Sequence, residues 1–329
     1  MRYLLRRFAF LLLTLWAAVT INFFIPRLMP GNPAQAMMAR FHGRVNPSAI
    51  KALEVAFGVH TRQSLLSQYF SYLGNTARGN FGISLTYFPL PVSSVIRQGL
   101  WWTLGLVGVT TILSFIIGTA IGTVAGWRRG GKLDSILPPV FVVTSALPYF
   151  WVGMLLILVF SVRMHGFLPN DGAYDQLVNV PGWNGTYIVD VLKHAVLPGA
   201  TLIVTAIGGW ILTMRNNVIT VVAEDYVRMG RAKGLSNRRL MYQYAARNAI
   251  LPNLAGFAMS LGFIVGGAIL IEFVFNYPGL GFLLLNAVNN LDDPLMQTLF
   301  LLITVTVLVA VFICDLVTLV LDPRTRTKA

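Results

Sequence analysis

The sequence has little cysteine and little charge, and both shortages narrow what the chain can be. Of its 329 residues, one is cysteine and 11% are charged, whereas 56% are hydrophobic and the mean hydropathy is +0.68. The single cysteine, Cys314, excludes an intrachain disulfide and a cysteine metal cluster. A soluble domain is roughly 45 to 50% apolar. The composition therefore indicates a protein whose surroundings are largely lipid.

Acidic residues are also scarce, with 12 Asp and Glu against 25 Lys and Arg, which leaves a net charge of +13. Such an excess could indicate a nucleic-acid partner. The cations, however, flank long apolar runs, where they set the orientation of membrane spans. We therefore expect no nucleic-acid partner.

Groups for catalysis or metal binding are not clustered in the sequence. No H-x-x-H pattern and no Ser, His and Asp grouping occurs, so we expect no catalytic residue, no metal site and no enzyme activity. Gly126, Gly131 and Lys132 match the phosphate-binding pattern G-x-x-x-x-G-K, but Leu133 replaces the Ser or Thr that would bind magnesium and no strand is expected before it. We interpret this match as a glycine turn. The histidines are interpreted as structural or solvated: His42, His60, His165 and His194.

Six apolar segments are candidates for membrane spans, each of which needs about 20 apolar residues. The first could instead be a signal peptide, since Ala34, Gln35 and Ala36 form an A-x-A pattern. That tripeptide lies too far beyond the apolar run, so we expect the helix to be retained. The predicted spans are Phe8 to Ile25, Leu100 to Gly126, Ile136 to Val162, His194 to Met214, Ile250 to Phe275 and Gln297 to Leu321.

The distribution of cations predicts that both termini are cytoplasmic. With that orientation, the inner segments 1–7, 127–135, 214–249 and 322–329 hold 16 Lys and Arg in 60 residues, against 9 in 126 outside. The density inside is about fourfold higher, as the positive-inside rule requires. The predicted domains are 1–25 (tail and first span), 26–99 (an extracytoplasmic helical segment), 100–321 (a five-helix core containing a cytoplasmic loop, 214–249) and 322–329 (a cytoplasmic tail).

Within the outer segment, helical spacing of apolar residues predicts short helices over Ile50 to Phe57 and Leu65 to Leu73. Asn46, Pro47 and Ser48 supply a turn and cap before the first of them.

Three features inside the spans have a structural and a functional interpretation. Gly118, Gly122 and Gly126 form a smooth helix ridge, for packing within the bundle, for a subunit contact or for a moving seam. Glu272 and Asp315 are intramembrane acids, which are functional candidates by default, although no relay of such groups accompanies them. Their roles stay open. Tyr149, Phe150 and Trp151 could line a passage or pack in the bundle, so no substrate-binding residue is assigned.

The cytoplasmic stretch from Arg215 to Arg247 predicts two short helices broken at Gly234, with Ser236 as the next N-cap. Glu224 lies four residues before Arg228, a favourable helical pair. Leu240, Tyr244 and Asn248 share one helix face, with Met241 and Ala245 beside them. This apolar and aromatic stripe indicates either a docking surface for a cytoplasmic protein or a helix lying on anionic lipid.

These residues resemble a known family, the permeases of the dipeptide, oligopeptide and nickel class of ABC importers, and the first of its two permease types. EDYVRMGRAKG, from Glu224 to Gly234, followed by RNAILP, resembles the EAA loop by which such permeases dock on an ATPase. Asn32 stands where Asp is usual in this class, and the departures at Asn80 and Tyr244 indicate a divergent branch. The other similar patches are LMPGNPA, GNFGISL followed by Pro91 and Val92, SALPYFWVGMLLILVF, NYPGLG and LDPRTR.

The resemblance implies an all-α, six-span bundle of the type I importer kind, in a bacterial or archaeal plasma membrane. It implies import of di- and oligopeptides by alternating access, with oligosaccharides or nickel as alternative substrates. A stand-alone channel or receptor is the competing class. Implied partners are a second homologous permease, one or two ATPase subunits that hold ATP and Mg, an extracytoplasmic binding protein and membrane lipid; no cofactor is expected in this chain. The implied ATPase-coupling residues are Glu224, Asp225, Tyr226, Arg228, Arg231, Ala232, Lys233 and Gly234.

Overall fold

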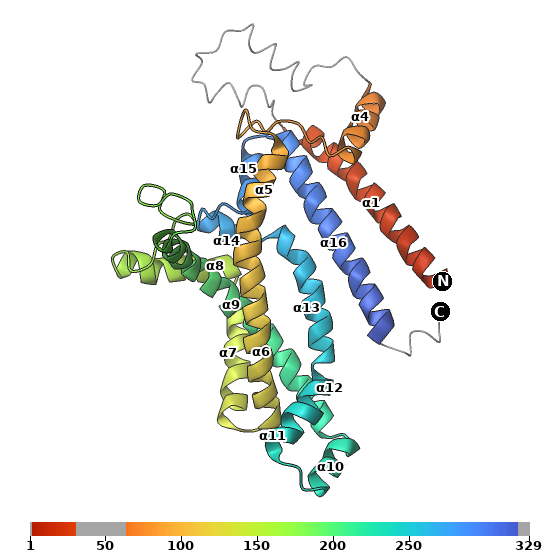
Figure 1. The fold of residues 1–329 in the computed structure, drawn as a ribbon, viewed down its shortest axis with the longest axis vertical. Coiled ribbons are helices and arrows are strands. Elements are labelled where there is room, and N and C mark those ends of the chain that lie inside the picture. The colour runs from red at the N-terminus through yellow and green to blue at the C-terminus, as the bar shows by residue number, and fades with distance from the viewer. Residues whose placement is uncertain (1, 31–63, 322–329) are drawn as a thin grey trace.

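The computed structural model describes the backbone of residues 2–30 and 64–321, and side chains within 5–30 and 64–314 apart from 138, 142 and 145. The described chain is helical, and its long helices run side by side along the longest axis (Figure 1). The predicted helix over residues 50–57 and the side chain of Asp315 lie outside the described part.

The elements are α1 (Arg2–Leu28), α4 (Leu65–Ala77), α5 (Val92–Thr103), η1 (Leu104–Gly108), α6 (Val109–Trp127), α7 (Lys132–Ala146), α8 (Tyr149–Leu156), η2 (Ile157–Arg163), α9 (Gly185–Val222), α10 (Asp225–Ala232), α11 (Asn237–Arg239), η3 (Leu240–Ala246), α12 (Arg247–Ala249), α13 (Leu251–Phe263), η4 (Ile264–Gly266), α14 (Ile269–Val274), α15 (Leu280–Asn289) and α16 (Asp293–Leu321).

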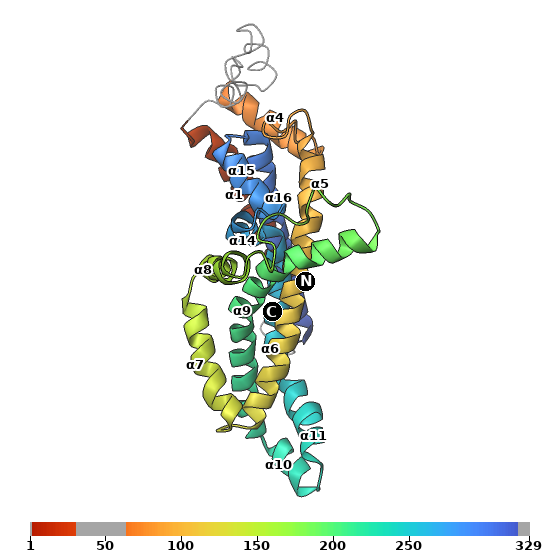
Figure 2. The ribbon, with the colours of Figure 1, turned by 90° about the vertical axis from the view of Figure 1, so that its left-hand side faces the viewer.

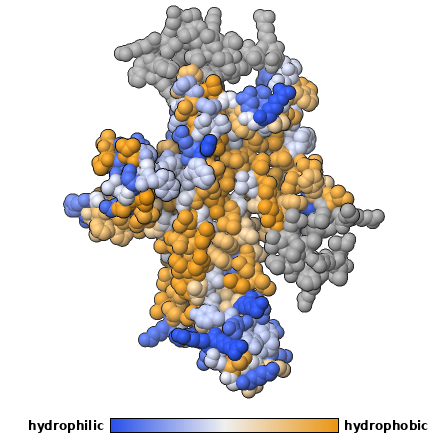
Figure 3. All heavy atoms as spheres, viewed as in Figure 1, coloured by the Kyte–Doolittle hydropathy of each residue, from blue (hydrophilic) through white to orange (hydrophobic). Residues whose placement is uncertain are grey.

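Four of the described helices are long and apolar enough to cross a membrane, or five when one bent pair is joined. The all-α membrane fold is thus confirmed, while the count of six spans stays a prediction. On the face shown in Figure 3, apolar side chains form a broad band across the middle of the molecule, and hydrophilic ones gather at the end that holds α10 and α11. The four spans are Leu5–Leu28, Val92–Trp127, Gly185–Val222 and Asp293–Cys314, and the bent pair is Asn237–Ala249 with Leu251–Gly266.

Helices α6 and α9 pack along the glycine ridge that the sequence predicts. A Cβ added to Gly118 would lie 2.6 Å from the Cβ of Trp210. A Cβ added to Gly122 would lie 2.5 Å from the carbonyl oxygen of Ile211, and a Cβ added to Gly126 would lie 2.7 Å from the carbonyl oxygen of Arg215. Because those partners are mostly backbone, the two helices approach as closely as glycine allows. The ridge is therefore a packing surface within the bundle.

The predicted span from Ile136 to Val162 is wrong as a single helix. Helix α7 ends at Ala146, Leu147 and Pro148 have extended backbone, and α8 begins at Tyr149 in a new direction (Figure 1). Proline disfavours helical backbone at the residue before it and cannot donate to a preceding turn. At the break, Tyr149 and Trp151 are 37% and 53% exposed in this chain.

The predicted span from Ile250 to Phe275 is also broken. Helix α13 tightens into the 3₁₀ turn η4, and Gly267 then takes φ +66°, a conformation that L side chains rarely adopt. Helices α14 and α15 follow as short elements that return toward α16. The buried residues of α15 join α5 and α16 in one core, which includes Val92, Leu280, Leu284, Leu295 and Leu299. Ile271 of α14 belongs to a second core, with Leu106 and Leu197.

The first and last long helices, α1 and α16, lie side by side (Figure 1). Asn22, which is 4% exposed, donates to the Gln297 carbonyl oxygen (2.7 Å) and to the Tyr72 hydroxyl of α4 (3.1 Å). Helix α4 confirms the predicted helix over Leu65 to Leu73, and Ser64 caps its first turn.

Candidate functional site

The predicted cytoplasmic loop lies at one end of the molecule, where α10, α11, η3 and α12 connect α9 to α13 (Figure 1). The loop is shorter than the predicted 214–249, because α9 continues to Val222. Helix α9 continues because Met214 and Val218, both fully buried, pack against Ala249 at the far end of the loop.

Helix α10 has defined ends. Glu224 occupies the N-cap position with extended backbone, and Asp225 in the first turn suits the positive end of the helix dipole. At the other end the Leu235 N–H donates to the Gly230 carbonyl (3.3 Å) and the Gly234 N–H to that of Arg231 (3.0 Å). With Gly234 at φ +75°, this pair of bonds is a Schellman motif, which confirms the helix stop predicted at Gly234.

One face of α10 is fixed to the rest of the loop by packing. Val227 is 1% exposed, and a Cβ on Gly230 would lie 2.8 Å from Leu240 Cδ2. The glycine therefore allows η3 to lie directly against α10. Tyr226 accepts a hydrogen bond from Asn248 (2.8 Å), and Asn217 of α9 donates to the Ala249 carbonyl (3.2 Å). These contacts join α9, α10 and α12 into one unit.

The other face of α10 is open. All eight residues predicted to contact an ATPase are exposed in the chain, together with Met229 at 60%. They are presented by a helix whose opposite side is buried, so its position follows that of the bundle. Whether they bind a partner remains a prediction, and Met229 is an exposed apolar residue on this face that the sequence reasoning did not single out.

Two details of the predicted loop are corrected by the structure. The stripe of Leu240 and Tyr244 does not form an outer surface, because Leu240 is fully buried and Tyr244 lies beside Gly230. Arg228 pairs with Asp225 at 3.7 Å and not with Glu224, which stands at the N-cap position without a side-chain capping bond. Ser236 stands at the predicted N-cap position, although its side chain donates and accepts no capping bond.

The turn between α6 and α7 lies next to this unit. Asp134 accepts from the Gly130 N–H (2.8 Å) and forms an ion pair with Arg215 of α9. The guanidinium of Arg215, and then the Gly130 N–H, hold the pKa of Asp134 below its usual value. Gly130 has φ +79°, and the turn is preceded by helix α6. These contacts support its interpretation as a glycine turn.

A second polar cluster surrounds Glu272, which is fully buried in α14. Its carboxylate accepts from the Thr103 hydroxyl (2.8 Å) and from the N–H groups of Gly281 (2.6 Å) and Phe282 (3.3 Å), while Thr103 accepts from the Leu280 N–H (2.7 Å). The two side chains thus cap the first turn of α15. A Cβ on Gly279 would lie 2.4 Å from the carboxyl carbon. Glu272 therefore has a structural role, which the sequence left open.

A third cluster explains the patch GNFGISL. Ser84 and Asp292 are both fully buried and share a hydrogen bond, and Asp292 also accepts from the Thr86 N–H (2.8 Å) and the Leu295 N–H (3.2 Å). Asp292 thereby caps α16 and fastens the segment before α5 to it. The sequence reasoning missed Asp292, whose signal was an acid two residues before Pro294 and the apolar run that follows it.

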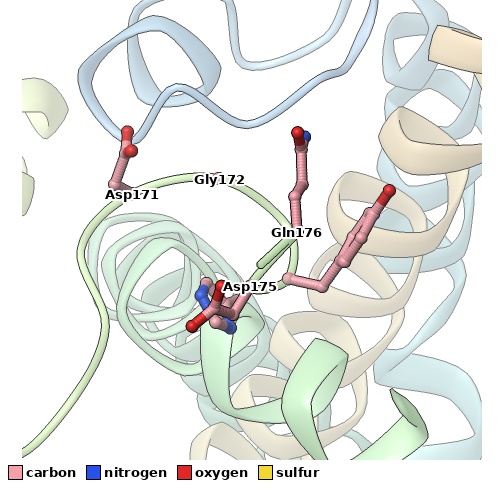
Figure 4. Close-up of a pocket in the computed structure, with 6 residues that line it drawn as sticks. Asp171, Gly172, Asp175 and Gln176 are labelled. Carbon is pink, nitrogen blue, oxygen red and sulfur yellow. The ribbon is translucent and has the colours of Figure 1, made fainter. Parts of the chain in front are cut away.

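A small polar pocket of about 410 Å³ lies where the loop before α9 meets that helix. His194 lies within α9, not at a helix start, and its Nδ1 contacts the Asp190 carbonyl (2.9 Å) and carboxylate (3.3 Å). Asp171 and Gln176 project from the same loop (Figure 4), and Asp171 accepts a hydrogen bond from Asn276 (2.6 Å). In the described part of the chain, no three His, Cys, Asp or Glu side chains are placed to hold a metal. The pocket is lined by Asp171, Gly172, Tyr174, Asp175, Gln176 and His194.

Comparison with known proteins gives one consistent result. Residues 118–327 match the family described as binding-protein-dependent transport system inner membrane component. The chain is 31% identical to the di/tripeptide transport system permease protein DppB of Pseudomonas aeruginosa, with 98% of each chain covered. It is 30% identical to the oligopeptide transport system permease protein AppB of Bacillus subtilis (98% of each) and 29% identical to the dipeptide transport system permease protein DppB of Lactococcus lactis (99% of each).

Proposed function

Because this chain belongs to the family of inner membrane components of binding-protein-dependent transport systems, we propose that it forms half of the pathway by which an ATP-driven importer carries di- and oligopeptides. The peptide substrate is supported by the names of its relatives, which transport dipeptides, tripeptides and oligopeptides. Oligosaccharides or nickel remain the alternative substrates for the same machinery.

The proposed complex contains a second, similar permease, one or two cytoplasmic ATPase subunits that bind ATP and Mg, and an extracytoplasmic binding protein, all in or on a bacterial or archaeal plasma membrane. Both termini lie in the cytoplasm. The excess of cations in the predicted inner segments supports this orientation. The end bearing α10 then faces the ATPase.

The observation that carries the proposal is the geometry of α10. The exposed residues of α10 include a thioether, Met229, and an aromatic residue, Tyr226, whose hydroxyl is held by Asn248. Together with the charged groups around them they form a composition typical of protein interfaces. Its buried face is joined to α9 and α12, so a push on α10 moves the bundle. When the ATPases close on ATP, α10 carries that motion into the spans, which rock between inward-facing and outward-facing arrangements.

Charge reversal tests this coupling role. Arg231→Glu and Lys233→Glu should leave membrane insertion intact, because both side chains are exposed, one in the last turn of α10 and one at its C-cap. Both changes should reduce the ATP turnover that substrate and binding protein stimulate, because they reverse the charge of the surface proposed to contact the ATPase. The matched control is Arg128→Glu, the same change on an exposed residue of the neighbouring turn. Unchanged stimulation in both α10 variants would contradict the coupling role.

The substrate is tested with the assembled complex in lipid, together with its binding protein. ATP hydrolysis is measured with di- to hexapeptides, with cello- or xylo-oligosaccharides and with nickel. Stimulation by peptides supports the proposal, and stimulation by sugars or nickel replaces the substrate but not the mechanism. If the chain purifies from native membranes without an ATPase and shows no ATP-dependent transport, a channel or receptor is the better assignment.

A further inference from the structure

The first part of α9 lies across the bundle instead of along it. Residues 185–197, here called the lateral arm, run crosswise to the rest of the helix (Figure 2). The change of direction occurs where Pro198, inside α9, cannot donate a backbone hydrogen bond. Asn184 fixes the start of the arm, because its side chain accepts from the Tyr187 N–H (2.8 Å).

The arm has two faces of different chemistry. On one face Asp190 accepts from the Asp175 N–H (2.7 Å) and from Asn179 (3.0 Å), and it also contacts His194. The loop before α9 therefore covers this polar face. The opposite face carries an exposed apolar stripe at helical spacing: Ile188 (41%), Val189 (52%), Leu192 (62%) and Val196 (45%).

The depth of the lateral arm in the bilayer follows from the length of the rest of α9. From Pro198 to Val222 the helix rises about 37 Å at about 1.5 Å per residue, whereas the hydrocarbon core of a bilayer is about 30 Å thick. Val222 borders the cationic loop that we place at one membrane surface. The arm then lies at the opposite surface, between hydrocarbon and water.

Two side chains beside the stripe suit a position at the boundary between hydrocarbon and water. Lys193 is exposed and borders the stripe, where its alkyl stem can lie over apolar surface while the ammonium reaches a lipid phosphate. Trp183, two residues before the arm, is fully exposed in the chain, and tryptophan is enriched where headgroups meet hydrocarbon. Between residues 164 and 192 the sequence contains no Lys or Arg, so attraction to anionic lipid contributes little here.

We propose that the lateral arm is an amphipathic anchor embedded in the outer-leaflet interface, with its apolar stripe against phospholipid chains. Because the exposed stripe is aliphatic and carries no charge, its chemistry fits acyl chains. The arm would hold the outer end of α9 at a fixed depth. The inference does not depend on which substrate is carried.

Spin labels test this placement in the assembled complex in phospholipid bilayers. With Cys314→Ser as background, a nitroxide is attached at Leu192→Cys or Ile188→Cys on the stripe. The matched control is Thr186→Cys, an exposed position of the same helix off the stripe. Collision rates are measured with oxygen, which concentrates in lipid, and with a water-soluble nickel chelate. We expect the oxygen-to-nickel ratio to be several-fold higher on the stripe than at Thr186.

Two results would overturn the anchor. Frequent collision with nickel at the stripe places the arm in water. Low collision rates with both reagents, together with an immobilised label, would place the arm against protein. If the label becomes immobilised only when the binding protein is added, the binding protein covers the stripe. If it is immobilised without the binding protein, the second permease covers the stripe. Two stripe positions are labelled so that one poorly folded variant does not decide the outcome.

Discussion

At the scale of single residues, Gly234 and Glu272 are positions where one side chain, or its absence, sets the course of the backbone. Gly234 takes φ +75° and ends α10, whereas Glu272 replaces the missing backbone partners at the start of α15. Both positions lie at helix ends, where backbone groups lack intrahelical partners. Substitutions there should act through the backbone.

Gly234→Ala should loosen the end of α10. An alanine in the left-handed conformation costs about 1 to 2 kcal/mol, and no other atom lies within 4 Å of the new Cβ, so crowding adds nothing. Hydrogen–deuterium exchange of residues 230–235 should become faster. Gly234→Asn is the control, since asparagine tolerates this conformation better and should retain more protection. Equal protection in Gly234→Ala and the unmodified chain would show that the Schellman motif does not limit exchange.

Glu272→Ala should destabilise the whole protein. It leaves the N–H groups of Gly281 and Phe282 and the Thr103 hydroxyl without their acceptor, and each buried orphan costs about 1 to 3 kcal/mol. Glu272→Gln keeps one acceptor oxygen and should cost less. The loss of stability in each variant is measured as the fall in the midpoint of thermal unfolding in detergent. Glu224→Ala is the control, because it makes the same change at an exposed position. A midpoint equal to that of the control would contradict the capping role.

At the scale of elements, apolar length and charge predicted that membrane helices exist but not how they bend. The apolar pattern correctly located α1, α16 and the central part of α9, because a long apolar run is compatible with few structures other than a membrane helix. It missed the breaks at Pro148 and Gly267, since apolar composition continues through both. In the loop, the exposed residues of α10 were named from the family resemblance, whereas the inward orientation of Leu240 depends on Gly230, whose missing side chain gives no periodic signal.

Gly122→Ala should weaken the contact between α6 and α9. The added Cβ would lie 2.5 Å from the Ile211 carbonyl oxygen, and backbone cannot turn aside as a flexible side chain can. Gly209→Ala is the control within α9, since nothing lies within 4 Å of its Cβ and alanine favours the helix by up to about 1 kcal/mol. The unfolding midpoint should fall in the first variant and hold or rise in the second. A fall in both, or in neither, would contradict the close-packed ridge.

At the scale of the whole molecule, the proposed orientation places α10 and the loop before α9 on opposite sides of the membrane. Lys233→Cys and Leu177→Cys are both exposed positions, the latter at 98%, and are made with Cys314→Ser. An impermeant maleimide should label Leu177→Cys in intact cells but Lys233→Cys only after permeabilisation. Tags on both termini should behave like Lys233→Cys. Reversed labelling would invert the topology without changing the fold.

The pairing of α1 with α16 has a consequence for biosynthesis. Asn22 donates to the carbonyl of Gln297, a residue made 275 positions later. At about 5 to 20 residues per second, a ribosome needs roughly 15 to 55 s to reach it. During that time the first helix resides in the bilayer without α16, and the side-chain amide of Asn22 lacks the Gln297 carbonyl as its acceptor. The contact between α1 and α16 therefore forms late in translation, and a nascent chain released before α16 would leave its first helix with α4 but without α16.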